Sequence, residues 1–78
     1  MELYEIDNIN MFVDDKIIIC DVKLRFRSQT VKCELKIEDD TGYINLFEPI
    51  YGVACGQAAV FYDDDKLLGS GWIIQTKQ

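Results

Sequence analysis

The sequence predicts an all-β domain, built as a small closed or nearly closed antiparallel β-barrel of about five to six strands. Apolar and polar residues alternate with a period of two from residue 17 onward, and no 3.6-residue pattern of useful length is present. Polar turns, several of them with glycine or aspartate, separate the alternating runs. A barrel is favoured over an open sheet because closure removes exposed strand edges that would otherwise aggregate.

The first sixteen residues are the exception to this alternation. Their apolar side chains fit neither a strand nor a helix alone: Leu3, Tyr4, Ile6, Ile9, Met11, Phe12 and Val13. We interpret residues 1–16 as an edge strand or an interdomain linker, and residues 17–78 as the barrel domain.

The clearest alternation lies in two runs that we expect to form a hairpin. In the first run one face is apolar, and its residues are Ile18, Cys20, Val22, Leu24 and Phe26. The other face carries Asp21, Lys23, Arg25 and Arg27. After a short turn at residues 28–30, apolar and charged residues alternate again over residues 31–38, which is typical of a half-buried strand.

Three further strands complete the predicted barrel. Residues 39–42 form a tight turn, and a strand follows from Tyr43 to Phe47. A fourth strand runs from Ala58 to Tyr62, and a fifth from Leu67 to Ile74 after a polar turn at residues 63–66. Gly69 and Gly71 lie inside the fifth strand, which suggests a sharp bend or the close approach of another backbone.

Size and composition indicate one globular domain. The chain has 78 residues, of which 49% are hydrophobic and 12% aromatic. The longest uninterrupted apolar stretch, Ile17 to Cys20, is far shorter than the roughly 20 residues of a membrane helix. No secretory pattern opens the chain, and three cysteines at unrelated spacings indicate no disulfide framework. We therefore expect a soluble domain in a reducing, cytoplasmic compartment.

Few residues offer catalytic chemistry. The chain has no histidine, nucleophile elbow, phosphate-binding loop or dinucleotide fingerprint. The acidic run Asp63–Asp65 lacks the spaced oxygen ligands of a calcium loop, so a solvated turn is favoured over a metal site. Cys55, beside Gly56, has no basic neighbour in sequence to activate its thiol. The sequence predicts no catalytic residue, metal or cofactor within this domain.

The basic residues are the most informative polar side chains. Eight basic against fourteen acidic residues give a formal net charge of −6, which argues against high-affinity nucleic-acid binding over the whole surface. Five of the eight basic residues nevertheless fall within residues 23–36. Two interpretations remain open. The basic strand face formed by Lys23, Arg25 and Arg27, with Lys32 nearby, could follow an RNA backbone, or it could pair with neighbouring carboxylates across the sheet.

Two segments together carry a resemblance to a known family. The run from Gly56 to Asp63, followed after a turn by Leu68-Gly69-Ser70-Gly71-Trp72-Ile73, resembles the closing signature of the bacterial-type tRNA-specific 2-thiouridylases. Residues 22–28 resemble the basic strand of the same family's C-terminal barrel domain. The chain departs from the family at Cys55, where a proline is common, and at Asp64, where a glycine is usual.

The resemblance implies a function within a larger enzyme. Enzymes of this family, which once carried the label of tRNA methyltransferases, adenylate the wobble uridine of tRNA and transfer sulfur to it from an enzyme persulfide. The resemblance implies that ATP, with magnesium, and the catalytic cysteines belong to an N-terminal ATP-pyrophosphatase domain, which a small central domain follows. It implies tRNA as a partner of this chain, and the charge pattern makes Lys23, Arg25, Arg27 and Lys32 the expected contacts. A sulfur-relay protein is a further expected partner.

The alternative to RNA contact is an interaction barrel. In that interpretation the chain holds the catalytic domains, or the sulfur-relay partner, without touching RNA. Its net negative charge favours this alternative. We expect the chain to be an excised part of the larger enzyme or a separately encoded module.

Overall fold

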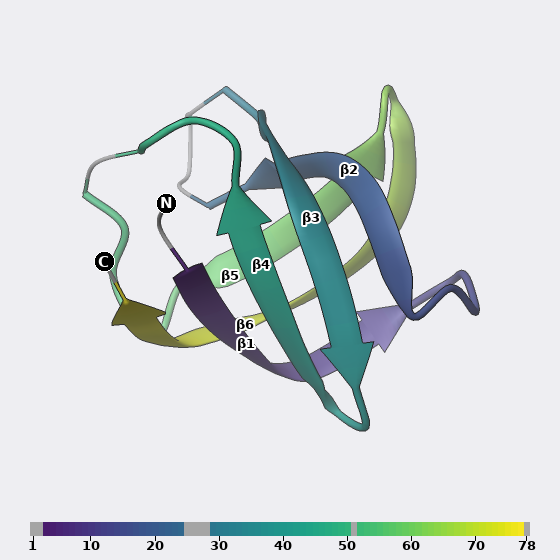
Figure 1. The fold of residues 1–78 in the computed structure, drawn as a ribbon, viewed down its shortest axis with the longest axis horizontal. Helices are drawn as coiled ribbons and strands as arrows, with labels where there is room; N and C mark the ends of the chain where they lie inside the picture. Colours follow the sequence, from purple (N-terminus) through teal and green to yellow (C-terminus); the bar gives the residue numbers. More distant parts are fainter. Residues whose placement is uncertain (1–2, 25–28, 51, 78) are drawn as a thin grey trace.

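The six strands of the structure close into one antiparallel barrel (Figure 1). The structure is a computed structural model that describes residues 3–24, 29–50 and 52–77. The strands within these ranges are β1 Leu3–Met11, β2 Ile17–Lys23, β3 Val31–Glu38, β4 Thr41–Leu46, β5 Ala58–Asp63 and β6 Lys66–Lys77. Around the barrel they follow the order β1-β4-β3-β2-β5-β6. The predicted fold class is confirmed.

Three hairpins connect neighbouring strands, and those between β3 and β4 and between β5 and β6 have tight two-residue turns. In the β2–β3 hairpin Cys20 lies opposite Cys33, as the alternation of both runs predicts. The β3–β4 hairpin turns at Asp39 with φ 56°, and the β5–β6 hairpin turns at Asp64 with φ 53°. Aspartate tolerates this left-handed backbone better than most residues, so both turns can form without glycine at these positions.

The structure differs from the sequence-based interpretation in the first sixteen residues. β1 has a neighbour on each side, because Leu3 pairs with Asn45 of β4 and with Lys77 of β6. The register of β1 against β6 shifts twice, between Glu5 and Ile6 and again between Asp7 and Asn10. Each shift breaks the strict alternation of side chains, which explains why the apolar pattern of this segment fits no single period.

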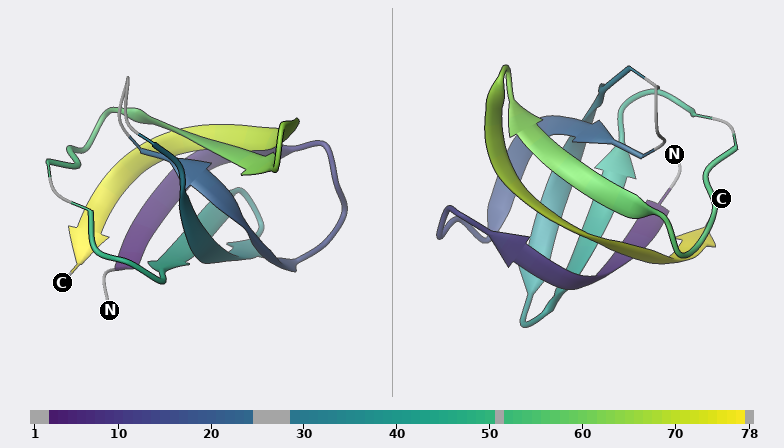
Figure 2. Two further views of the ribbon diagram at one scale, coloured as in Figure 1. Left: turned by 90° about the horizontal axis from the view of Figure 1, so that it is seen from above. Right: turned by 180° about the vertical axis from the view of Figure 1, so that it is seen from behind.

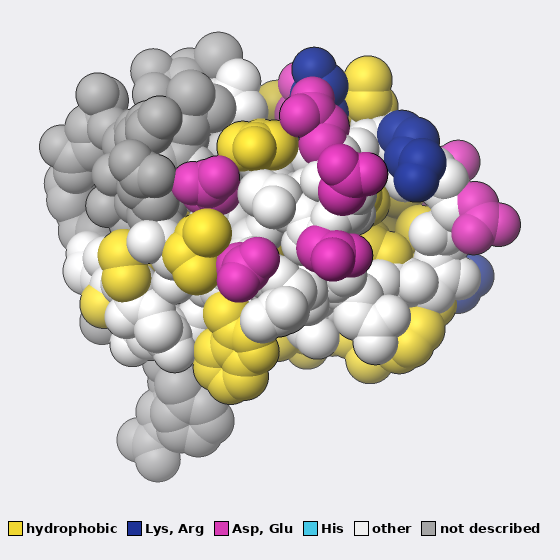
Figure 3. Space-filling view, turned by 90° about the horizontal axis from the view of Figure 1, so that it is seen from below, with side chains coloured by type: hydrophobic (Ala, Val, Ile, Leu, Met, Phe, Trp, Pro, Cys, Tyr) yellow, Lys and Arg dark blue, Asp and Glu magenta, His cyan; other side chains and the backbone are white. Residues whose placement is uncertain are grey.

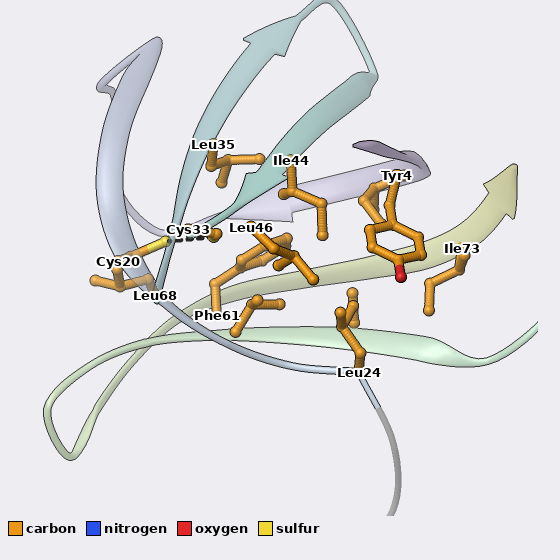
Figure 4. Close-up of a cluster of buried hydrophobic side chains, with 13 residues drawn as sticks. Tyr4, Cys20, Leu24, Cys33, Leu35, Ile44, Leu46, Phe61, Leu68 and Ile73 are labelled. Carbon is orange, nitrogen blue, oxygen red and sulfur yellow. Dashed lines mark hydrogen bonds between the residues drawn. The ribbon is translucent and has the colours of Figure 1, made fainter. Parts of the chain in front are cut away.

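The interior of the barrel is filled by inward-facing side chains from all six strands (Figure 4). The buried core consists of Tyr4, Ile6, Cys20, Val22, Leu24, Cys33, Leu35, Ile44, Leu46, Ala59, Phe61, Leu68 and Ile73. Phe61 is the largest of the fully buried side chains. No helix in the described part of the chain has the length and apolar character needed to cross a membrane.

Gly69 and Gly71 lie where β6 passes close to β1. A Cβ atom on Gly71 would overlap Cγ2 of Ile6 and lie 3.1 Å from the carbonyl oxygen of Asp7. A Cβ atom on Gly69 would overlap the carbonyl oxygen of Asn10 and lie 2.8 Å from the Cα of Met11. The close backbone approach predicted for these glycines is confirmed.

Candidate nucleic-acid interface

Lys23 ends β2 on the outer wall of the barrel. It pairs with Val60 of β5, and its side chain is half-buried. Leu24, the next residue, turns into the core, so the alternation predicted for this run holds up to that point. Arg25 and Arg27, the other members of the basic strand face, lie outside the described residues.

Lys32 has a carboxylate partner within the sheet. It lies directly opposite Asp21, and its Nζ is 3.5 Å from an Asp21 carboxylate oxygen. Lys36 also has a carboxylate partner, Glu38 on the same strand, with 3.5 Å between its Nζ and a carboxylate oxygen. Such exposed pairs stabilise a fold by at most about 1 kcal/mol. For Lys32 the structure therefore favours the cross-strand pair, whereas Lys23 has no salt bridge to another residue in the described ranges.

A pocket of about 310 Å³ lies beside Lys23, and we call it the Trp72 pocket. It is lined by Lys23, Leu24, Gly56, Gln57, Ala58, Val60 and Trp72. In the right-hand view of Figure 2, β5 lies in front with β2 behind it, and β5 pairs with β2 along one edge and with β6 along the other. Residues from the basic strand and from the closing signature thus meet at one site, although at least 33 positions separate Lys23 from Gly56 in the chain.

The strand register explains why the site is hollow. Ala58 lies opposite Trp72, and Val60 lies between Lys23 on one side and Ser70 on the other. Small side chains on β5 therefore form a low floor between a lysine and a tryptophan. The side chain of Trp72 is 52% exposed, whereas its neighbour Ile73 is fully buried.

Backbone hydrogen bonds fix the turn that closes one end of the pocket. The N–H of Gly56 donates to the carbonyl oxygen of Ile73 over 2.7 Å, and the N–H of Ile73 donates to that of Gln57 over 2.9 Å. Gly56 has φ 89°, a backbone conformation that favours glycine. These two hydrogen bonds hold the turn at Gly56 and Gln57 against β6 beside the pocket.

Charges on the surface are distributed unevenly around the barrel. A second hollow of about 280 Å³ also touches Lys23, but its lining includes Asp64 and Asp65. On the face seen from below in Figure 3, Asp and Glu side chains lie near the middle, and the Lys or Arg side chains lie towards the edge. Polyphosphate is repelled from such acidic surfaces. Among the sites that the structure describes, the Trp72 pocket combines a lysine with no carboxylate in its lining.

Trp72 and Gln57 are the site residues that the sequence analysis did not single out. The sequence nevertheless contains a signal for Trp72. Successive side chains of a strand point to opposite faces, and because Gly71 and Ile73 face inward, Trp72 must point outward.

In the described part of the chain the cysteines are not grouped to hold a metal ion, and two of the three are buried. Cys20 and Cys33 are buried, with their sulfur atoms 3.9 Å apart (Figure 4). The hydrogen bond with Cys20 and then burial raise the pKa of the Cys33 thiol, which disfavours the reactive thiolate. Cys55 is exposed. No three His, Cys, Asp or Glu side chains within the described ranges are grouped to hold a metal ion.

Comparisons with known proteins give a domain family and individual relatives for this chain. Residues 2–73 match the family described as the aminomethyltransferase β-barrel domain. The chain is 55% identical over 71 residues to tRNA-specific 2-thiouridylase MnmA 1 of Aliarcobacter butzleri, a match that covers 91% of this chain and 21% of that protein.

Two further relatives carry the same name. The chain is 50% identical to the tRNA-specific 2-thiouridylase of a Nitratiruptor species, over 85% of this chain and 20% of that protein. It is 48% identical to the tRNA-specific 2-thiouridylase of Campylobacter jejuni, over 90% of this chain and 21% of that protein. The chain therefore spans about one fifth of the length of the curated relatives that it matches.

Proposed function

Since the chain belongs to the aminomethyltransferase β-barrel domain family and resembles a fifth of each tRNA-specific 2-thiouridylase compared, we propose that it is the C-terminal, tRNA-contacting domain of such an enzyme. The domain positions tRNA and performs no chemistry by itself. ATP with magnesium, uridine activation and sulfur transfer belong to the ATP-pyrophosphatase and central domains of the whole enzyme. A sulfur-relay protein is a further partner, and the enzyme acts in the cytoplasm.

The observation that carries this proposal is the position of Lys23. Its ammonium group stands on the outer wall of the barrel, without a salt bridge to the described residues, in a chain whose net charge is −6. In the sequence it is followed at alternate positions by Arg25 and Arg27. A short track of positive charge on an acidic molecule restricts RNA to one side, because phosphates are attracted there and repelled elsewhere.

Lys32 contributes less to the proposed track than the other three residues. Its pair with Asp21 must open before a phosphate can take the place of the carboxylate. We therefore rank Lys23, Arg25 and Arg27 above Lys32 as RNA contacts.

A specific observation also supports the second candidate, an interaction barrel. Several large apolar side chains are exposed, namely Phe12, Ile17, Ile19, Tyr43, Phe47, Leu67, Trp72 and Ile74. Exposed apolar surface of this extent is typical of a domain that packs against other protein. The two roles are compatible if packing and RNA contact use different faces, and they are distinguished by the experiment below.

The test measures the affinity of tRNA for the 78-residue chain across a salt series. Each phosphate contact releases condensed counterions, so changing Arg25 or Arg27 to Ala should weaken binding and flatten the logarithmic salt slope by about 0.7 to 0.9 units per residue. In the whole enzyme the same changes should raise the tRNA concentration for half-maximal thiolation. The rate at saturating tRNA should stay near normal, because these residues act in binding rather than in the chemical step.

Two variants serve as controls. Lys66→Ala removes an exposed lysine from the β5–β6 hairpin and should leave the slope unchanged. Lys32→Ala should have a smaller effect than Arg25→Ala. If both arginine variants bind tRNA as the unchanged chain does, with the fold intact, RNA contact through this strand is rejected and the interaction barrel is the remaining function.

A further inference from the structure

We propose that the Trp72 pocket binds the base of an unpaired nucleotide, which stacks on the indole of Trp72 while Lys23 holds a neighbouring phosphate. This inference rests on the proposed function, because it specifies which part of an RNA the barrel recognises. It adds a single-stranded specificity that the basic strand alone does not provide, since a row of positive charges binds duplex and single strand alike.

Trp72 is exposed on the outer wall of the barrel. Its side chain is 52% exposed in a strand position flanked by two buried residues, Gly71 and Ile73, so the indole projects from the wall. Exposed aromatic side chains beside a positive groove are the usual platform for bases in single strands, because every base has a π-face. In a duplex the bases stack on one another and cannot reach such a platform.

The shape of the pocket also supports the binding of a base. Its volume of about 310 Å³ lies at the lower end of the range for small-ligand sites, which suits one nucleotide. The floor is Ala58 and Val60, whose small side chains leave space above β5 beside the indole. The hydrogen bonds between Gly56, Gln57 and Ile73 hold the turn that borders this space against β6. A site border that is already ordered loses less conformational entropy when a ligand binds.

Polar groups that can bind a phosphate and a base edge lie around the indole. Lys23 lies on the opposite wall from Trp72 and supplies a cation for a phosphate. Gln57, exposed at the turn, supplies an amide that can donate to or accept from a base edge. The other hollow beside Lys23 contains Asp64 and Asp65, so a phosphate on Lys23 is favoured on the Trp72 side.

The test uses the single tryptophan of the chain as its own probe, because Trp72 accounts for all tryptophan fluorescence. A short single-stranded oligouridylate should quench this fluorescence and saturate at low salt. An RNA duplex with the same number of phosphates, and inorganic polyphosphate, should bind weakly and leave the emission nearly unchanged. Equal quenching by the duplex or by polyphosphate would overturn the proposal.

Variants then separate stacking from charge. Trp72→Ala should weaken binding of a labelled oligouridylate about tenfold, and Trp72→Phe should weaken it less because a smaller ring still stacks. The matched control is Ile74→Ala, which removes another exposed apolar side chain from the same face of β6, outside the pocket. Lys23→Met keeps the aliphatic stem and should flatten the salt slope by about 0.7 units, whereas Lys66→Met should not.

The outcomes distinguish this inference from the proposed function. If Trp72 variants bind the single strand normally while Arg25→Ala and Arg27→Ala weaken tRNA binding, the pocket is rejected and the basic strand stands. If the Trp72 variants weaken binding and the arginine variants do not, the pocket stands without the basic strand. Should Trp72→Ala fail to fold, the comparison of Trp72→Phe with Ile74→Ala and the quenching of the unchanged chain decide the question.

Discussion

Two lysines of the β2–β3 hairpin differ in the residue that lies opposite them on the adjacent strand, and this difference decides whether each can bind an external anion. Lys32 faces Asp21 across the β2–β3 ladder at 3.5 Å, so its charge is already compensated. Lys23, two positions beyond Asp21 on the same strand, faces Val60 of β5, which cannot compensate it. An apolar cross-strand neighbour therefore leaves the cation available for an external anion.

The three cysteines provide a test at the same scale. In the folded chain only Cys55 should react quickly with a thiol reagent, because Cys20 and Cys33 are buried in the core and the pKa of Cys33 is raised. Titration with an aromatic disulfide should show one fast thiol in buffer and three in denaturant. A Cys55→Ser variant should lose the fast phase, and a second fast thiol in the folded chain would contradict the described packing.

At the scale of the element, β6 closes the barrel by passing close to β1. Gly69 and Gly71 permit this close approach. The register of β6 shifts against both of its neighbours, β1 and β5, and such irregularities bend a strand. The same strand then places Trp72 outward, so the residue that forms the pocket is held by the strand that completes the fold.

Changing Gly71 to Val should therefore destabilise the barrel by about 1–3 kcal/mol, because the added carbons would collide with Ile6 and crowd the backbone at Asp7. The measurement is the free energy of unfolding in denaturant. Ser70→Val is the matched control, since Ser70 is exposed on the outer face of the same strand and should change stability little. An unchanged unfolding midpoint in the Gly71 variant would show that the close approach is not required.

The alternation of residues predicted the faces of β2 and β3 because one side of each strand is buried and the other is solvated. It could not predict β1 in the same way, since two register shifts interrupt the pattern within nine residues. The Trp72 pocket could not be predicted either, because it depends on which residues of β2, β5 and β6 lie side by side. That register follows from closure of the barrel, and no local pattern encodes it.

At the scale of the whole molecule, charge and shape divide the barrel into unlike faces. The β2–β5–β6 wall holds the Trp72 pocket and Lys23, while acidic side chains gather on the face shown in Figure 3. The exposed apolar side chains include Phe12 and Ile17, which lie outside the lining of the pocket and are available for packing against other domains. An arrangement of this kind orients one wall towards RNA and leaves other surfaces for protein.

The most direct test of RNA recognition by this wall is nuclear magnetic resonance of the isotope-labelled chain during titration with tRNA. The account predicts that amide and indole shifts cluster at Lys23, Gln57, Ala58 and Trp72, and that the amides of Glu5 and Glu34 on other strands stay unchanged. Shifts that gather on the acidic strands instead, or no shifts up to about 1 mM tRNA at low salt, would contradict the account, because nonspecific contacts alone fall within that affinity range.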